Sequence, residues 1–197
     1  AQTEGPAGCT DDAVQDPAHR IASNAQAVEV NSRWGRRFAE VLLFVVIVGG
    51  IYAWRTRDLL PAGDRVAAPA FKLTDLQGRP WSLDALAGKP VVLYFFAPWC
   101  AVCAASSPQL RWFDRWQRDE VQVVLVGLDW SSPAELAEYA ARHELRMPVL
   151  AAGPQTAVDY RIRGYPTYYV LDAEGRVAGR DFGYTTAPGL WLRTRGL

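Results

Sequence analysis

The chain has 197 residues, 50% of them hydrophobic and 21% charged, which suits one ordinary domain with appendages. Lysine plus arginine and aspartate plus glutamate each number 21, so the net charge is zero and no basic surplus favours nucleic-acid binding. Three cysteines, Cys9, Cys100 and Cys103, and two histidines are too few for a disulfide-rich scaffold and argue against a four-ligand zinc site. We therefore expect no metal centre.

Residues 1–33 are rich in Gly, Pro, Asp, Gln, Asn and Ser and have no sustained apolar period. This composition predicts a flexible N-terminal tail. Cys9 follows Pro6-Ala7-Gly8, which has a faint likeness to a lipoprotein processing site. Because no apolar stretch precedes it, we interpret Cys9 as an incidental thiol.

An apolar segment runs from Phe38 to Trp54 and has the sequence FAEVLLFVVIVGGIYAW. Glu40 is its only charged residue, and its 17 residues are just enough for a helix that crosses a hydrocarbon core about 30 Å thick. Aromatic and arginine residues flank both ends, as at membrane interfaces. We predict a single transmembrane helix, residues 38–54, within an anchor region of residues 34–57.

Two alternatives to an anchor fit this segment less well. A buried soluble helix would carry a polar face, and none is present. A cleaved signal peptide would begin close to the apolar run, whereas 37 residues precede it. Lysine and arginine are equally frequent within twenty residues on either side, so charge alone does not set the orientation.

The remainder predicts a linker over residues 58–68 and one compact α/β domain over residues 69–197. Strongly apolar segments within the domain are typical of strands buried on both faces, and each of the two longest precedes a helical segment. The expected strands are residues 71–73, 80–83, 91–96, 121–128, 147–151, 167–171 and 177–182, and the expected helices are 101–118 and 133–143. The first two strands form a hairpin, and so do the last two.

A Cys-x-x-Cys motif stands where strand 91–96 ends and helix 101–118 begins. Cys100 is therefore expected at the helix N-terminus, where free N–H groups and the helix dipole stabilise a thiolate. Cys103 is close enough to form a disulfide with Cys100 and to release a mixed disulfide. We predict Cys100 as the attacking thiol and Cys103 as the buried resolving thiol. Half a zinc site has the same spacing, but no second ligand pair occurs.

The segment Gly164-Tyr165-Pro166-Thr167 opens the strand 167–171. A proline at a strand start marks an edge or a special turn, and by itself it fits an ordinary turn. Together with the Cys-x-x-Cys motif, it predicts a cis Pro166 facing the sulfurs, which leaves the Tyr165 backbone free to bind an extended client peptide. Trp99, next to Cys100, is expected to form a wall of the site, with ordinary packing as the alternative.

These motifs resemble the thioredoxin superfamily. The resemblance covers about residues 66–197 and rests on VVLYFFAPWC followed by AVC, on Pro108 five residues beyond Cys103, and on GYPT ahead of a terminal hairpin. The segment APAFKLTDLQGRPWSLDALAGKPVVLYFFAPWC resembles the membrane-anchored extracytoplasmic branch that includes TlpA, ResA and DsbE, and the ending DFGYTTAPGLWLR is similar to the ScsD-like group. The fold implied is a central mixed β-sheet flanked by helices, with an N-terminal β-hairpin extension, after a single transmembrane helix.

The resemblance also implies an activity and a location. It implies a thiol-disulfide oxidoreductase in the cytoplasmic (inner) membrane, single-pass, with its thioredoxin-like domain on the periplasmic side. The implied partners are disulfide-containing client proteins and a transmembrane thiol reductase of the DsbD type as electron donor. Cytochrome c biogenesis and copper tolerance are the processes associated with this branch. The chain has no glycine-rich nucleotide loop, so we expect no flavin or nicotinamide cofactor.

Two positions depart from the family pattern. Thioredoxins have a buried carboxylate six residues before the first cysteine, where this chain has Tyr94. The cytochrome-maturation branch has a glutamate three residues after the second cysteine, where this chain has Ser106. The proton acceptor of Cys103 therefore stays open, and so does assignment to cytochrome c maturation.

We favour a function in which the dithiol reduces disulfides of extracytoplasmic proteins. An oxidant of the same fold that donates disulfides is one alternative, and a carrier whose dithiol binds Cu(I) or haem is another. A thiol peroxidase fits less well, because such enzymes need a lone reactive cysteine at this position. On helix 101–118, Trp112, Phe113 and Trp116 are expected on the core side together with Leu110.

Overall fold

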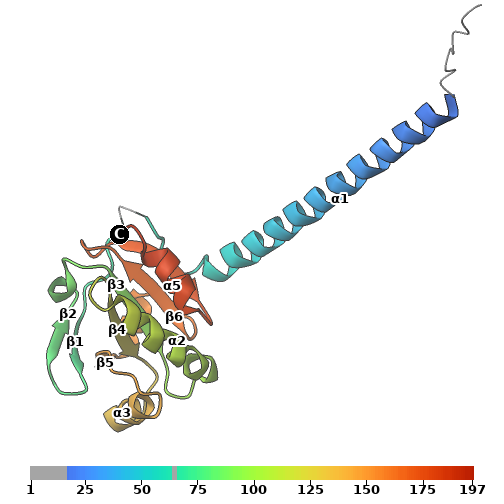
Figure 1. Cartoon of the computed structure of the whole chain (residues 1–197). Helices are drawn as coiled ribbons and strands as arrows, with labels where there is room; N and C mark the ends of the chain where they lie inside the picture. Colours follow the sequence, from blue (N-terminus) through green and yellow to red (C-terminus); the bar gives the residue numbers. More distant parts are fainter. Residues whose placement is uncertain (1–16, 64–65) are drawn as a thin grey trace, which may run out of the picture. The chain divides into compact units, whose positions relative to one another are not determined.

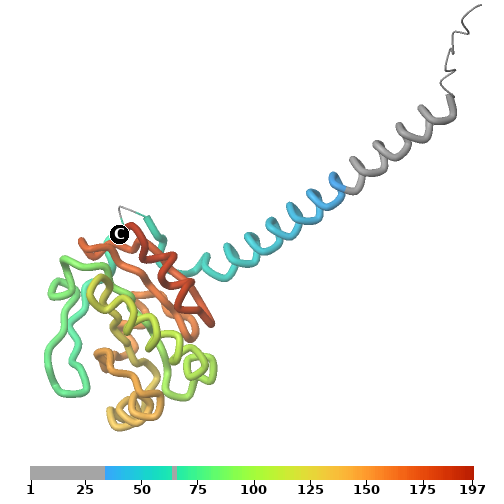
Figure 2. Tube along the Cα trace, viewed as in Figure 1, coloured from blue at the N-terminus to red at the C-terminus, as the bar shows by residue number. Residues whose placement is uncertain are grey.

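The computed structural model describes residues 17–63 and 66–197, with side chains from residue 34 onward. Cys9 and residues 1–16 of the predicted tail lie outside the described residues. The chain divides into two units, Ala1–Ile51 and Tyr52–Leu197. The tube in Figure 2 follows the second unit from the cyan end of the first helix to the red C-terminal helix.

The first unit contains helix α1, Pro17–Thr56, whose last turn belongs to the second unit. The helix begins at Pro17, within the residues predicted as a tail, so residues 17–33 are helical as well. Its segment Trp34–Thr56 has 23 residues and is long and apolar enough to cross a membrane. At about 1.5 Å per residue this segment exceeds the thickness of a hydrocarbon core. The predicted apolar helix is therefore present.

The second unit is built on a seven-stranded sheet with the strand order β2-β1-β5-β4-β3-β6-β7 (Figure 1). Strand β4 is parallel to both of its neighbours, β3 and β5. The other neighbouring strands pair antiparallel. The strands are β1 Lys72–Asp75, β2 Pro80–Ser82, β3 Val91–Phe96, β4 Gln122–Gly127, β5 Val149–Ala151, β6 Thr167–Leu171 and β7 Val177–Phe182. This mixed sheet with an N-terminal hairpin confirms the predicted thioredoxin fold.

Strand β3 lies inside the sheet between β4 and β6, and all six of its residues are apolar or aromatic and buried. Successive side chains of a strand point to opposite faces, so the strand supplies two cores. Tyr94 and Phe96 belong to the core that contains Cys103, and we call this side of the sheet the disulfide face. Leu93 and Phe95 belong to the other core, which also contains Leu59 and Leu60 near the start of the domain, and we call this side the entry face.

Helices cover both faces. Helices α2, α3 and α5 bury side chains on the disulfide face, whereas α4 and the short 3-10 helix η1 pack on the entry face. Their bounds are η1 Asp84–Leu86, α2 Ala101–Gln117, α3 Pro133–Arg142, α4 Pro154–Asp159 and α5 Ala187–Thr194. The sequence analysis did not predict α4 and α5, because helices of six and eight residues are too short to show a clear period.

The residues predicted as a linker contact the domain. Gly63 N–H donates to Val177 C=O at 2.8 Å, Val177 N–H donates to Val66 C=O at 2.8 Å, and Ala67 pairs with Arg176 in an antiparallel bridge. These contacts add a short edge beside the beginning of β7. The chain is thus fastened to the sheet before it reaches the residue-69 domain boundary that the sequence predicts.

Candidate active site

Cys100 is the N-cap residue of α2, the position at which the chain turns from β3 into the helix. Its backbone is extended, and its Sγ accepts a hydrogen bond of 3.1 Å from Cys103 N–H. Cys100 C=O accepts from Ala104 N–H at 3.1 Å, which begins the helical pattern. An apolar strand that ends in a helix N-terminus therefore places one sulfur where backbone N–H groups point at it.

Cys100 and Cys103 form a disulfide, with their Cα atoms 5.2 Å apart. Cys100 is 6% exposed and Cys103 is completely buried. An incoming sulfur therefore reaches Cys100 and not Cys103. When the bond is reduced, the N–H group that now points at Cys100 Sγ is in place to stabilise a thiolate there.

The loop before β6 carries the other residues singled out in the sequence. The peptide bond between Tyr165 and Pro166 is cis, as predicted, and Pro166 is buried. Trp99 is 66% exposed, and its ring meets the Tyr165 ring edge-on at 5.8 Å between centroids. Within the described residues, neither the N–H nor the C=O of Tyr165 forms a backbone hydrogen bond. Both groups are available to an extended peptide.

Asp129 is a residue of this region that the sequence analysis missed. It follows β4 and has a positive φ of 48°. Burial and the Asp129 carboxylate together raise the pKa of Tyr165, so the phenol stays protonated at neutral pH. The position of Asp129 directly after β4 could have indicated its place, because β3 and β4 are parallel and the residues that follow them meet at one edge of the sheet.

Behind Cys103 the protein buries hydroxyl groups. Tyr94 hydroxyl donates to Cys103 C=O at 3.3 Å, and Ser107 hydroxyl donates to the same oxygen at 3.1 Å. Ser107 also shares a hydrogen bond of 3.2 Å with Tyr139 hydroxyl from α3. Burial raises the pKa of Tyr94 and of Tyr139, so both remain neutral. Among the described residues, no carboxylate is buried on this face.

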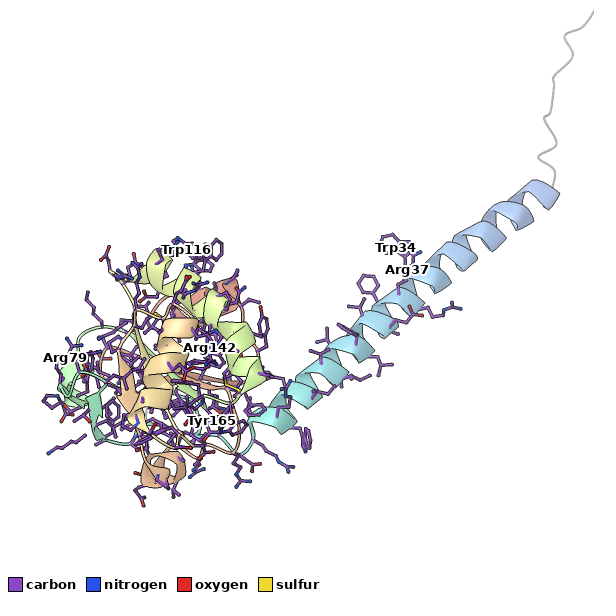
Figure 3. The ribbon with its side chains drawn as sticks, turned by 90° about the horizontal axis from the view of Figure 1, so that it is seen from below. Trp34, Arg37, Arg79, Trp116, Arg142 and Tyr165 are labelled. Atoms are coloured by element: carbon purple, nitrogen blue, oxygen red, sulfur yellow. A yellow bond between two sulfur atoms is a disulfide. The ribbon has the colours of Figure 1, made fainter. Side chains whose placement is uncertain are left out.

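The prediction for the aromatic residues of α2 was only partly right. Leu110 and Phe113 are fully buried, but Trp112 and Trp116 are 59% and 56% exposed, so placing these two tryptophans on the core side was wrong. The helix packs through Cys103, Ser106, Ser107, Leu110 and Phe113, which share one face at helical spacing. Trp116 stacks instead on Trp191 of α5. Figure 3 shows Trp116 on the opposite side of the domain from Tyr165.

The sheet, the capped disulfide and the cis-proline loop together define a thioredoxin-like protein with a Cys-x-x-Cys pair. The model of the AhpC/TSA family matches residues 65–180, and the chain belongs to this family. The chain is 28% identical to the thioredoxin-like protein YneN of Bacillus subtilis over 151 residues, which cover 74% of this chain and 89% of YneN. It is 27% identical to the thiol-disulfide oxidoreductase ResA of Bacillus cereus over 121 residues, 60% of this chain and 69% of ResA.

Solved structures give the same result. The exposed lipoprotein thioredoxin Etrx1 of Streptococcus pneumoniae is similar with a TM-score of 0.58 and 26% identity, covering 66% of this chain and all of that one. A DsbF homologue of Corynebacterium diphtheriae has a TM-score of 0.64 and 23% identity over 71% of this chain and 91% of its own, which shows the fold alone.

These relatives confirm the predicted membership of the thioredoxin-like group that includes ResA. They include thiol-disulfide oxidoreductases, and the Cys100–Cys103 disulfide fits the redox motif of that class. Such relatives imply client proteins that contain disulfides. They do not separate cytochrome c biogenesis from copper tolerance, and both stay predictions.

Proposed function

We propose that the protein is a membrane-tethered thiol-disulfide oxidoreductase that reduces disulfides of extracytoplasmic proteins. One observation carries the proposal: the disulfide lies at the N-terminus of α2, with Cys103 N–H on Cys100 Sγ and with Cys103 buried behind it. This arrangement favours one sulfur as the nucleophile and keeps the other away from clients.

The reaction consists of two exchanges. In the reduced protein the Cys100 thiolate attacks one sulfur of a client disulfide, a mixed disulfide forms, and the other client sulfur leaves and takes a proton. Cys103 then loses its proton and attacks Cys100 Sγ, which releases the first client sulfur as a thiol. Two electrons pass from the dithiol to the client, the two client thiols take up the proton lost by Cys103 and one proton from the solvent, and the Cys100–Cys103 disulfide is formed.

The client would lie along the loop that contains Tyr165 and Pro166. The free backbone groups of Tyr165 support this, since they offer one donor and one acceptor to an extended segment. The exposed ring of Trp99 offers an apolar surface beside Cys100. In this role Trp99, Tyr165 and Pro166 bind the client, while Cys100 and Cys103 carry out the exchange.

The oxidised dithiol must be reduced again after each cycle. We propose a transmembrane thiol reductase of the DsbD type as the electron donor, because no nucleotide-binding loop is found in the sequence. Residues 38–54 would cross the cytoplasmic membrane, with the thioredoxin-like domain, residues 69–197, on the extracytoplasmic side. The length and apolar character of α1 support the anchor.

The mechanism is tested by trapping clients on the full chain. Cys103→Ala removes the resolving sulfur, so clients should accumulate as mixed disulfides on Cys100, detectable on non-reducing gels. Cys100→Ala is the matched control and should trap none. If Cys103→Ala yields no adduct through Cys100 in membranes that contain oxidised clients, the exchange mechanism is excluded.

The direction of the reaction is tested by the reduction potential of the Cys100–Cys103 couple. Reductants of this fold have a reduction potential of about −270 mV, as thioredoxin does, and oxidants have one of about −120 mV, as DsbA does. We expect a value at the reducing end. A value at the oxidising end would make the protein a disulfide donor instead.

A further inference from the structure

The last turn of α1 contacts the end of β7. Tyr52 hydroxyl donates to Arg180 C=O at 3.1 Å, and the Arg55 guanidinium lies 5.5 Å from the centre of the Phe182 ring. A Cβ atom at Gly183 would come within 2.8 Å of Arg55 Nη2, so the guanidinium lies directly against this part of the backbone. All these residues belong to the second unit.

The end of β7 in turn contacts the loop proposed to bind the client. Gly183 N–H donates to Pro166 C=O at 2.8 Å, and Phe182 is paired with Thr167 in the sheet. The Phe182 ring lies so close to Gly164 that a Cβ atom there would be 2.9 Å from it. Phe182 and Gly183 therefore contact both Arg55 and the loop.

The residues directly after α1 are packed and hydrogen-bonded against the sheet. Leu59 and Leu60 are buried, Arg180 donates to Leu60 C=O at 2.6 Å, and Leu60 N–H donates to Tyr169 hydroxyl at 3.1 Å. An ion pair of 3.2 Å joins Asp58 to Arg163, at the beginning of the same loop. This pair is well exposed and contributes little by itself, so the buried contacts carry the attachment.

We propose that Arg55 is a positioning residue for the loop of residues 163–166, so that the end of the anchor helix forms part of the client-binding edge. The proposal rests on the proposed function, in which the Tyr165 backbone binds the client. A planar guanidinium packs against both an aromatic ring and a flat stretch of backbone, and lysine does not replace it there. Without this contact Phe182 is held less firmly, and a smaller fraction of the molecules has the loop ready to bind.

This role has a kinetic signature that differs from general damage. A loop that is less often in its binding position weakens client binding, so KM rises while the exchange at the sulfurs and kcat are unchanged. A small disulfide without a peptide backbone makes no use of the loop. Its rate of reduction, and the reduction potential of the couple, should therefore not change.

The chain offers a matched control at Arg57. Its guanidinium lies 5.6 Å from the Trp54 ring, a contact of the same kind as that of Arg55, but with no contact to Phe182 among those that the structure describes. Arg55→Lys and Arg57→Lys both keep the positive charge beside the apolar helix. Arg57 also forms an ion pair of 3.6 Å with Asp58, but this pair is exposed and contributes little. The variants therefore differ chiefly in that Arg55→Lys alone loses contacts with Phe182 and Gly183.

The experiment uses the full chain in detergent micelles, with a peptide that contains one disulfide and with 2-hydroxyethyl disulfide as substrates. We expect Arg55→Lys to raise KM for the peptide about two- to five-fold, the size expected from loss of one exposed cation–π contact, with kcat unchanged. The rate with 2-hydroxyethyl disulfide and the reduction potential should stay at wild-type values. Arg57→Lys should match the wild type in every measurement.

Hydrogen exchange gives a readout that does not depend on activity. Exchange at the Gly183 amide, which is bonded to Pro166 C=O, should be faster in Arg55→Lys than in Arg57→Lys. Equal KM values and equal exchange in the two variants would overturn the proposal, and so would a parallel loss of activity toward both substrates. If the wild type reduces neither substrate, the proposed function fails, and the exchange rates still decide whether Arg55 positions the loop.

Discussion

The two faces of the sheet bury tyrosines alike, but the hydroxyl groups of these tyrosines hold different parts of the chain. On the disulfide face they hold the redox helix. Tyr94 hydroxyl reaches Cys103 C=O, and Tyr139 hydroxyl reaches Ser107, whose own hydroxyl also bonds Cys103 C=O. The first turns of α2 are thus tied to β3 and α3 directly behind the disulfide.

On the entry face the hydroxyls hold the chain where it joins the domain. Tyr169 hydroxyl accepts from Leu60 N–H and donates to Tyr160 C=O at 2.7 Å, and Tyr160 hydroxyl donates to Pro69 C=O at 2.7 Å. The ring packing is similar on both faces, with Tyr94 against Tyr168 and Phe95 against Tyr160, both at 4.9 Å between centroids. The faces therefore differ in which segment of the chain the hydroxyls hold.

In this domain the packing of the core and the attachment of particular chain segments to it therefore depend on different parts of the same side chains. The apolar and aromatic side chains stabilise both faces by the same mechanism, which depends on buried area and close packing. Most of the hydroxyls add direction, because a buried hydroxyl that has a partner fixes the position of one particular group, whereas Tyr168 hydroxyl on the disulfide face is buried without a partner among the described residues. One face consequently fixes the position of the reactive helix, and the other fixes the segment that leads to the anchor.

The largest expected effect tests whether the two faces are equally packed. Leu125→Ala removes a completely buried side chain from the disulfide face, and Leu93→Ala removes one from the entry face. Each substitution should lower the free energy of unfolding by about 2–5 kcal/mol, because it loses buried area and leaves a cavity. Urea unfolding of the oxidised full chain in detergent measures both. A loss below about 1 kcal/mol on one face alone would contradict equal packing.

The sequence was sufficient to predict the strands and the disulfide, because both depend on local patterns. The segments VVLYFF and VQVVLVGL are apolar throughout, which is typical of central strands, and the Cys-x-x-Cys motif follows the first of them directly. The place of Cys100 at a helix N-terminus follows from that order alone. The exposed sides of α2 were harder to predict, since Trp112 and Phe113 are adjacent and equally aromatic.

The contacts that distinguish the two faces could not be predicted in the same way. Ser107 and Tyr139 are 32 residues apart, and Leu60 and Tyr169 are 109 residues apart. No short pattern in the sequence links such pairs; folding brings them together. For the same reason the segment after α1 looked like a linker, whereas its contacts with β6 and β7 lie far along the chain.

A smaller effect is expected when the entry face loses one hydroxyl. Tyr169→Phe keeps the ring but leaves Leu60 N–H and Tyr160 C=O without this partner, so the free energy of unfolding should fall by about 1–3 kcal/mol. The Leu60 amide should exchange faster, and the reduction potential should not change. A changed reduction potential together with unchanged hydrogen exchange at the Leu60 amide would contradict the separate roles of the two faces.

The matching substitution on the disulfide face should lower the free energy of unfolding by a smaller amount. Tyr94→Phe removes one of two hydroxyls on Cys103 C=O, and Ser107 hydroxyl remains at 3.1 Å. We expect a loss of about 0.5–1.5 kcal/mol, the usual range for one hydrogen bond. Exchange should become faster for amides in the first turns of α2 and stay unchanged at Leu60. A loss greater than that of Tyr169→Phe would show that Ser107 does not retain this attachment.

The last comparison concerns acid, to which the buried tyrosines of neither face should respond. Burial raises the pKa of the tyrosines on both faces, so none of them titrates below neutrality. Among the described residues the one buried carboxylate is Asp75 in β1. Burial by itself would raise its pKa, but hydrogen bonds from Arg79, Trp81 and Gln77 outweigh this and lower the pKa to about 2.

The sign of the acid effect follows from this lowered pKa. The ordinary value is about 3.9 in the unfolded chain, so Asp75 stabilises the fold above about pH 4 and this contribution is lost as the pH falls toward 2. Asp75→Asn should remove that pH dependence and lower the urea midpoint at pH 6. Urea midpoints at pH 6, 4 and 2.5 measure it. If the variant loses as much stability between pH 4 and 2.5 as the wild type does, the acid-sensitive group lies elsewhere, and the two faces must then be searched for it.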